Sequence, residues 1–152
     1  MVTRILAPRE MGLATRTRDR ESQRGSVLVE VALVLILLIM LTFGVMEYGW
    51  MFFRLQQLNN AARDGARQAV LPAATNSQVE STVQDLVDSW GLTSVNVDVD
   101  ISHDDISVLP RGELITVTVS APYSDMQLVG LPLLPLPDTL STSVTMAKEG
   151  PS

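Results

Sequence analysis

The chain contains no cysteine and a single histidine, His103, in its 152 residues. The absence of cysteine excludes a disulfide framework and a thiol nucleophile. One histidine excludes a two-histidine metal site and leaves no conventional serine–histidine pair with a spare base. A glycine-rich phosphate loop is also missing. These absences remove most of the common enzyme chemistries from consideration.

One acidic group has residue types suited to a metal site: Asp98, Asp100, His103, Asp104 and Asp105. Oxygen-rich clusters can bind calcium, but a helix–loop–helix calcium loop needs glycine at its sixth position and a carboxylate at its twelfth. Counted from Asp98, those positions hold His103 and Leu109. We therefore interpret the group as a solvated strand face followed by an acidic turn. We expect no enzymatic activity, no metal and no cofactor.

Charge divides the chain at a long apolar run. Residues 1–25 hold six arginines and three acids, a net of +3, whereas residues 26–152 hold five basic and fourteen acidic residues, a net of −9. The two values add to the total of −6. An acidic main portion lacks the basic footprint that nucleic acid requires. Nucleic acid is therefore not an expected partner.

The run from Ser26 to Met46 contains one ionisable residue, Glu30. As a helix it is about 31 Å long at 1.5 Å per residue, close to the thickness of a bilayer's hydrocarbon core, about 30 Å. The arginines before it predict a cytoplasmic N-terminus and an extracytoplasmic C-terminal portion. Membrane lipid is thus an expected partner.

Three interpretations of this N-terminus compete. A cleaved secretory signal is disfavoured, because aromatic residues of the kind found at membrane interfaces follow the run instead of a small-residue cleavage site. A plain uncleaved anchor explains everything except Gly25 and Glu30. Those two residues resemble the processing site of type IV prepilins, in which a membrane peptidase cuts after the glycine and leaves the helix attached. Cleavage between Gly25 and Ser26 would place Glu30 fifth in the mature chain.

Glu30 has two interpretations of its own. A carboxylate in an apolar segment usually faces a partner, and the new amino group of Ser26, on the same or a neighbouring subunit, would be one. Alternatively, Glu30 reaches the nearby headgroup region. The processing hypothesis therefore assigns it a role in assembly and helix register.

Apolar periodicity predicts the remaining elements. One continuous helix is expected from Ser26 to Leu71, and a second from a capping box at Ser77–Glu80 to Gly91. Small residues on the first helix predict close approach of a helix or sheet, either inside the domain or at an oligomer seam: Ala61, Ala62, Gly65, Ala66 and Ala69. Alternation then predicts three strands, at Val95–Ile101, Glu113–Ala121 and Leu140–Ala147.

The predicted fold is therefore a membrane-anchored α+β protein with a long N-terminal helix, a short second helix and a small antiparallel sheet of about three strands. Its length suits one domain with appendages. Four parts are expected: a basic cytoplasmic leader (1–25), a transmembrane helix (26–46), an extracytoplasmic extension of that helix (47–71) and a small α+β extracytoplasmic domain (72–152).

Residues 122–138, named here the Pro/Leu loop, join the second and third predicted strands. Four prolines preclude a regular helix or central strand. So long an apolar loop must cover the core, touch the membrane surface or meet another protein. The candidate partner contacts are its apolar side chains: Leu128, Val129, Leu131, Leu133, Leu134 and Leu136.

Together these segments resemble the TadE-like proteins. The resemblance is carried by the start at Arg24–Leu33, by Gly44–Gly49, by Leu58–Arg67 and by the strands Gly112–Val119 and Val144–Glu149. It implies a minor pilin or pseudopilin of a tight-adherence (Tad, or Flp) pilus system that supports adhesion and biofilm formation. The implied partners are a prepilin peptidase, other pilins or pseudopilins, a secretion ATPase and pilus assembly platform proteins. The alternative is an unprocessed, single-pass binding module that recruits a partner through its outer domain.

Overall fold

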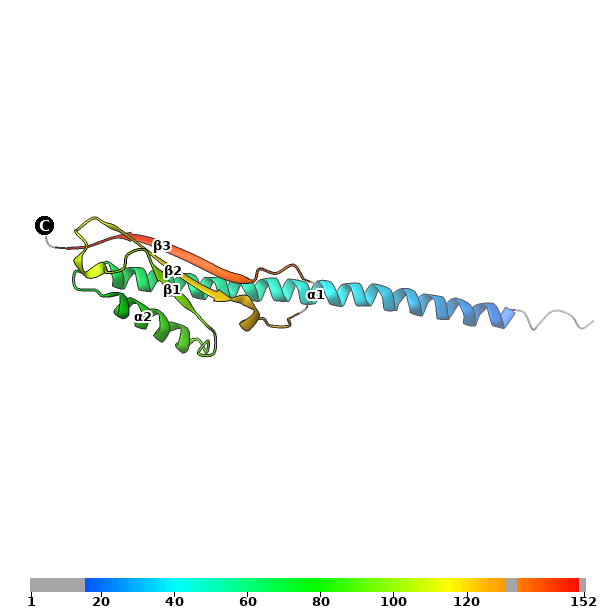
Figure 1. Ribbon diagram of the computed structural model, residues 1–152. Coiled ribbons are helices and arrows are strands. Elements are labelled where there is room, and N and C mark those ends of the chain that lie inside the picture. The colour runs from blue at the N-terminus through cyan, green and yellow to red at the C-terminus, as the bar shows by residue number, and fades with distance from the viewer. Residues whose placement is uncertain (1–15, 131–133, 151–152) are drawn as a thin grey trace, which may run out of the picture. The chain divides into compact units, whose positions relative to one another are not determined.

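The computed structural model describes residues 16–130 and 134–150, with side chains from Gly25 onward. The elements, shown in Figure 1, are α1 (Arg16–Ala69), α2 (Asn76–Ser89), β1 (Asp98–Ile101), η1 (Ile106–Val108), β2 (Leu114–Pro122), η2 (Tyr123–Asp125) and β3 (Thr139–Ala147). A long apolar helix, a second helix and a three-stranded antiparallel sheet confirm the predicted α+β class.

Helix α1 begins earlier than predicted, at Arg16 instead of Ser26. The intervening residues include arginine, glutamate and glutamine, which favour helix, and contain no proline or glycine before Gly25. The predicted end at Leu71 is two residues late, because the helix closes at Ala69 and the Leu71 amide bonds the Gln68 carbonyl in a tighter turn. Helix ends commonly vary by this much.

The chain divides into two compact units, residues 1–42 and 43–152. Among the described residues, one helix is long and apolar enough to cross a membrane, over Gly25–Ala69. Only 6% of its most apolar window is buried, which is unlike the core helix of a soluble protein. This helix is compatible with a single-pass membrane anchor.

The sheet of the second unit has the order β1-β2-β3, with both pairs antiparallel. Strand β1 is shorter than predicted and begins at Asp98 instead of Val95. In the β1–β2 register Asp98 pairs with Ser120, so an extended β1 would soon oppose Pro122. Because proline has no amide hydrogen, it cannot continue the ladder there.

The N-cap of helix α2 lies two residues before the predicted one. Its N-cap is Thr75, whose backbone N–H donates to Gln78 Oε1 at 3.2 Å, so the box is formed by Thr75 and Gln78 instead of Ser77 and Glu80. The predicted apolar face is correct in outline, because Val79, Val83 and Val87 are all fully buried.

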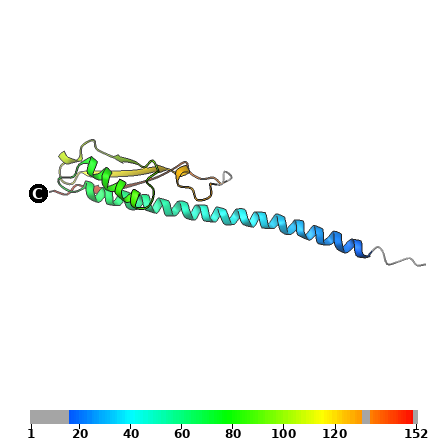
Figure 2. The ribbon, with the colours of Figure 1, turned by 90° about the horizontal axis from the view of Figure 1, so that it is seen from below.

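The core of the second unit lies between α1, α2 and the inner face of the sheet. Alternate residues of β2 point into it: Ile115, Val117, Val119 and Ala121. The small residues of α1 are fully buried, so packing within the domain is the correct interpretation of that surface. Figure 2 shows β2 running along the same part of α1 against which α2 lies.

Gly65 marks the closest approach in this core. A Cβ atom at that position would lie 2.8 Å from Val83 Cγ2 of α2 and 3.4 Å from Val117 Cγ1 of β2. Such contacts are too short for any side chain, so the lack of one lets α1 and α2 pack at this distance. Glycine is therefore required here by space and not by backbone conformation.

The chain's C-terminal end closes the other end of α1. Lys148 is buried, and its Nζ donates to the carbonyls of Ala69 at 3.2 Å and Leu71 at 2.7 Å. The Glu149 amide bonds the Val70 carbonyl at 2.8 Å. A helix leaves its last carbonyls unpaired and negatively polarised, so a cation is favourable at this point.

Candidate membrane-interface and assembly site

The three residues predicted for processing and assembly lie close together on α1. Gly25, Ser26 and Glu30 are exposed, and no atom lies within 4 Å of a Cβ placed on Gly25. Ser26 and Glu30 are four residues apart in the helix, so their side chains share one face. Processing at Gly25 and a role for Glu30 in assembly stay predictions.

The Pro/Leu loop is divided between exposed and packed residues. Leu128 and Val129 are 46% and 39% exposed. Leu134 and Leu136 are half-buried, and Leu136 packs against the core, so the C-terminal half of the loop covers the core as one interpretation expected. The other two candidate contacts, Leu131 and Leu133, lie outside the described residues.

Glu47 fixes the exposed half of this loop, a role that the sequence analysis did not assign. The carboxylate is fully buried. It accepts the Tyr123 hydroxyl at 2.7 Å and the amides of Leu128 and Val129 at 3.3 and 2.8 Å. The available signal was the position of a carboxylate directly after the apolar run. Its partners are 76 to 82 residues away, which no local pattern reveals.

Two aromatic residues of α1 hold the same loop by its carbonyls. The Tyr48 hydroxyl donates to the carbonyl of Pro135 at 2.9 Å, and Trp50 Nε1 donates to the carbonyl of Met126 at 2.7 Å. The guanidinium of Arg54 lies 4.5 Å from the centre of the Trp50 ring, a cation–π distance. Residues Glu47–Arg54, here called the clamp, therefore hold the Pro/Leu loop against α1.

The electrostatics of the clamp keep Glu47 charged and Tyr123 neutral. Burial acts to raise the pKa of Glu47, but hydrogen bonds from Tyr123 and from backbone amides outweigh it, so the pKa lies below its ordinary value of 4.5. Burial, reinforced by the bond to Glu47, raises the pKa of Tyr123. The pair is thus a carboxylate stabilised by a phenol that stays a donor.

The acidic group around Asp98–Asp105 does not come together as a set of metal ligands in the described part of the chain. No group of three or more potential ligands occurs among the residues that the structure describes. Asp98, Asp100, Asp104 and Asp105 are exposed, and Asp105 Oδ1 accepts the amide of Ser107 at the start of η1 at 2.9 Å. The interpretation as a solvated strand face and an acidic turn is confirmed for these side chains.

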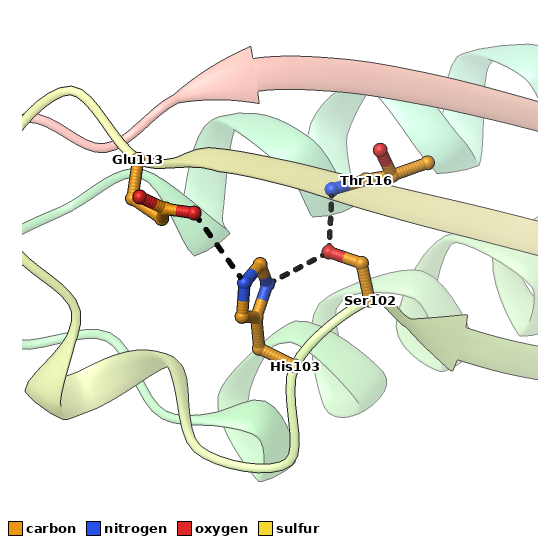
Figure 3. Close-up of polar contacts among 4 residues, drawn as sticks. All are labelled: Ser102, His103, Glu113 and Thr116. Atoms are coloured by element: carbon orange, nitrogen blue, oxygen red, sulfur yellow. Dashed lines mark hydrogen bonds and ion pairs between the residues drawn. The ribbon is translucent and has the colours of Figure 1, made fainter.

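His103 lies between a hydroxyl and a carboxylate, as Figure 3 shows. Its Nδ1 is 2.9 Å from Ser102 Oγ, and its Nε2 is 3.8 Å from Glu113 Oε1. Ser102 Oγ also accepts the amide of Thr116 at 3.0 Å. That hydroxyl is therefore engaged with strand β2, and the contacts with Thr116 and Glu113 tie the turn after β1 to β2 and to the residue before it.

The fold and the clamp define a class: an α+β protein in which, among the described residues, one candidate membrane span continues into the second unit. Residues 25–67 match the family model described as TadE-like protein. That segment, which includes Glu30 and the clamp, is similar to the TadE-like proteins, in agreement with the predicted resemblance. The family points to a component associated with the Tad pilus. No curated protein and no solved structure matches the chain.

Proposed function

We propose that the protein is a minor pilin or pseudopilin of a Tad (Flp, type IV-related) pilus assembly or secretion system and supports adhesion and biofilm formation. One observation carries the proposal. The family match begins at Gly25, the residue after which the sequence predicts cleavage, and it includes Glu30. The expected partners are prepilin peptidase, other pilins or pseudopilins and platform proteins.

The proposed location is the inner membrane, with the N-terminus in the cytoplasm. The excess of arginine in residues 1–25 supports this orientation. In this orientation the Gly25–Ser26 bond would lie at the cytoplasmic edge of the span, within reach of a peptidase on that side. Because the apolar run lies after this bond, cleavage would leave the anchor on the mature protein.

Glu30 would then act as the assembly residue. Cleavage creates an amino group at Ser26, one helical turn from the Glu30 carboxylate. Opposite charges at this spacing attract, and in an apolar environment an unpaired carboxylate is costly. Glu30 can therefore pair with its own N-terminus or with that of a neighbouring subunit, which would set the axial register between helices.

The processing step is tested by mass analysis of the mature N-terminus in the native cell. We expect the wild-type protein to begin at Ser26 and Gly25→Ala to keep its leader. Gly49→Ala is the matched control, since it makes the same change on the same helix at an open position. A wild-type protein that retains residues before Ser26 in the assembled machinery would overturn the processing claim.

The assembly step is tested with Glu30→Gln, which removes the charge and keeps the shape. We expect normal cleavage but reduced recovery in the sheared pilus fraction and reduced surface attachment. Glu80→Gln, at an exposed position on α2, is the control for loss of one acidic charge. Equal recovery of the two variants would contradict a role for Glu30.

A second candidate is the unprocessed binding module. It is favoured by the exposure of Leu128 and Val129 on a loop whose backbone is fixed by Glu47. This candidate predicts that Gly25 and Glu30 are dispensable, whereas Leu128→Ser with Val129→Ser abolishes function. The same set of variants therefore separates the two candidates.

We also propose that the protein has no catalytic activity. The engagement of Ser102 with Thr116 and the exposure of the acidic group support this. His103→Gln should therefore leave pilus production and attachment unchanged. Loss of either function at a wild-type level of folded protein would contradict the proposal.

A further inference from the structure

Residues 127–130 of the Pro/Leu loop are exposed and carry no charged side chain. Between Asp125 and Asp138 the sequence contains no ionisable residue. The loop nevertheless leaves Leu128 and Val129 largely outside the core. Two adjacent exposed side chains of this size, held by a fixed backbone, are an apolar projection and not a covering for the core.

This projection lies at the level of the last turn of the apolar run. A Cβ placed on Gly44 would lie 3.5 Å from Leu134 Cδ2, and the clamp residues Glu47 and Trp50 bond to Leu128, Val129 and Met126. The apolar run ends at Met46. Trp50 is only about 6 Å beyond that residue along the helix, at 1.5 Å per residue. The loop is thus packed beside the residues where α1 would leave the lipid.

Four polar backbone groups of the loop are paired with side chains of α1, which suits a poorly hydrated environment. The amides of Leu128 and Val129 are bonded to Glu47, and the carbonyls of Met126 and Pro135 accept from Trp50 and Tyr48. Pro132, Pro135 and Pro137 have no amide hydrogen to satisfy. Irregular backbone is tolerated near lipid only when its polar groups are paired in this way.

We propose that Leu128 and Val129 insert into the outer face of the bilayer from which α1 emerges. Lipid is the expected contact of these two side chains, because Val45 and Met46, at the same level of α1, are themselves exposed apolar residues of the span. Tyr48 and Trp50 add the aromatic rings that are typical of this interface. The loop is therefore a second, shallow membrane contact that orients the outer domain on the lipid surface.

This inference rests on the membrane anchoring proposed above, but not on processing or on the pilus. It is tested on the full chain in vesicles of phosphatidylethanolamine and phosphatidylglycerol. Because the protein has no cysteine, single nitroxide labels can be attached at Leu128→Cys, at Val34→Cys in the span and at Val108→Cys in η1. Each label's collision rate is measured with oxygen, which is enriched in lipid, and with a water-soluble nickel complex.

We expect the oxygen-to-nickel ratio at Leu128→Cys to be several-fold higher than at Val108→Cys and to approach that at Val34→Cys. Val129→Cys should repeat the result, and circular dichroism should show that each variant is folded. A ratio at Leu128→Cys equal to that at Val108→Cys, with Val34→Cys in lipid, would overturn the inference and leave the anchoring intact.

Two other outcomes of this experiment would also contradict lipid insertion of Leu128 and Val129. Low collision with both reagents at Leu128→Cys would mean that protein covers the loop, which contradicts lipid insertion. A nickel-dominated ratio at Val34→Cys would instead remove the anchoring itself, and the inference with it. The failure of the inference is therefore distinguishable from the failure of the proposed function.

Discussion

Glu47 shows how one buried charge can organise a long loop. An isolated carboxylate is costly to remove from water, whereas one that accepts a phenol and two amides is stabilised as the anion. The donors come from η2 and from the loop behind it, so the carboxylate joins α1 to a segment far away in sequence. The position of Leu128 and Val129 depends on this one side chain.

Replacing Glu47 by glutamine should destabilise the second unit. The amide keeps one acceptor, but its NH₂ group would face an amide or hydroxyl donor and leave a buried group unpaired. We expect a loss of about 1–3 kcal/mol in the free energy of unfolding, measured by urea titration in mild detergent. Glu80→Gln should stay within about 0.5 kcal/mol of wild type. Equal stability of the two variants would contradict the role of Glu47.

The same residue predicts acid sensitivity. Its pKa in the folded protein lies below the ordinary value of 4.5, so the unfolded state takes up the proton first as the pH falls. The contribution of Glu47 to stability is therefore present above pH 4.5 and is lost as the pH falls through the folded-state pKa. Melting temperatures of wild type and Glu47→Gln should converge over that window. A gap that stays constant with pH would count against the prediction.

Gly65 offers a test of packing with an internal control. Gly65→Ala places a methyl group 2.8 Å from Val83 and should destabilise by about 1–3 kcal/mol through overpacking. Gly49→Ala makes the same change where nothing is within 4 Å, so it should be neutral or stabilise the helix by up to about 1 kcal/mol. Thermal unfolding followed by circular dichroism distinguishes the two. A Gly65→Ala variant as stable as Gly49→Ala would refute the close approach.

At the scale of elements, local patterns predicted which elements exist better than where they begin or end. The valines of α2 and the β-branched residues of β2 carry their periodicity in the sequence, so both elements could be identified. The start of β1 could not, because it depends on the register that brings Pro122 opposite its extension. The clamp was equally inaccessible, since Tyr123, Leu128 and Val129 reach Glu47 only after the chain has folded.

The closure of α1 by Lys148 is another such long-range contact, and it can be tested. Lys148→Met keeps the aliphatic stem but removes the ammonium, leaving the carbonyls of Ala69 and Leu71 without their donor. We expect a loss of about 2–3 kcal/mol, because bonds from a charged donor are stronger than average. Hydrogen exchange should show faster opening of the last turn of α1. Unchanged protection there would argue against the cap.

At the scale of the whole molecule, the candidate membrane helix could be predicted from the sequence, because charge and hydropathy are sums over many residues and do not depend on long-range contacts. The four-part organisation stays a prediction, but the division at residues 42 and 43 makes one part of it testable. The buried core residues run from Leu58 to Leu140, entirely within the second unit. The clamp and its loop partners also fall inside residues 43–152. Among the described residues, the buried core therefore lies outside residues 1–42.

A fragment of residues 43–152 should therefore fold by itself. We expect cooperative thermal unfolding with a melting temperature close to that of the full chain in the same detergent, because the buried contacts are the same. Within the fragment, Glu47→Gln should lower the melting temperature by as much as it does in the full chain. A fragment without cooperative unfolding would mean that the second unit depends on the preceding helix and is not an independent folding unit.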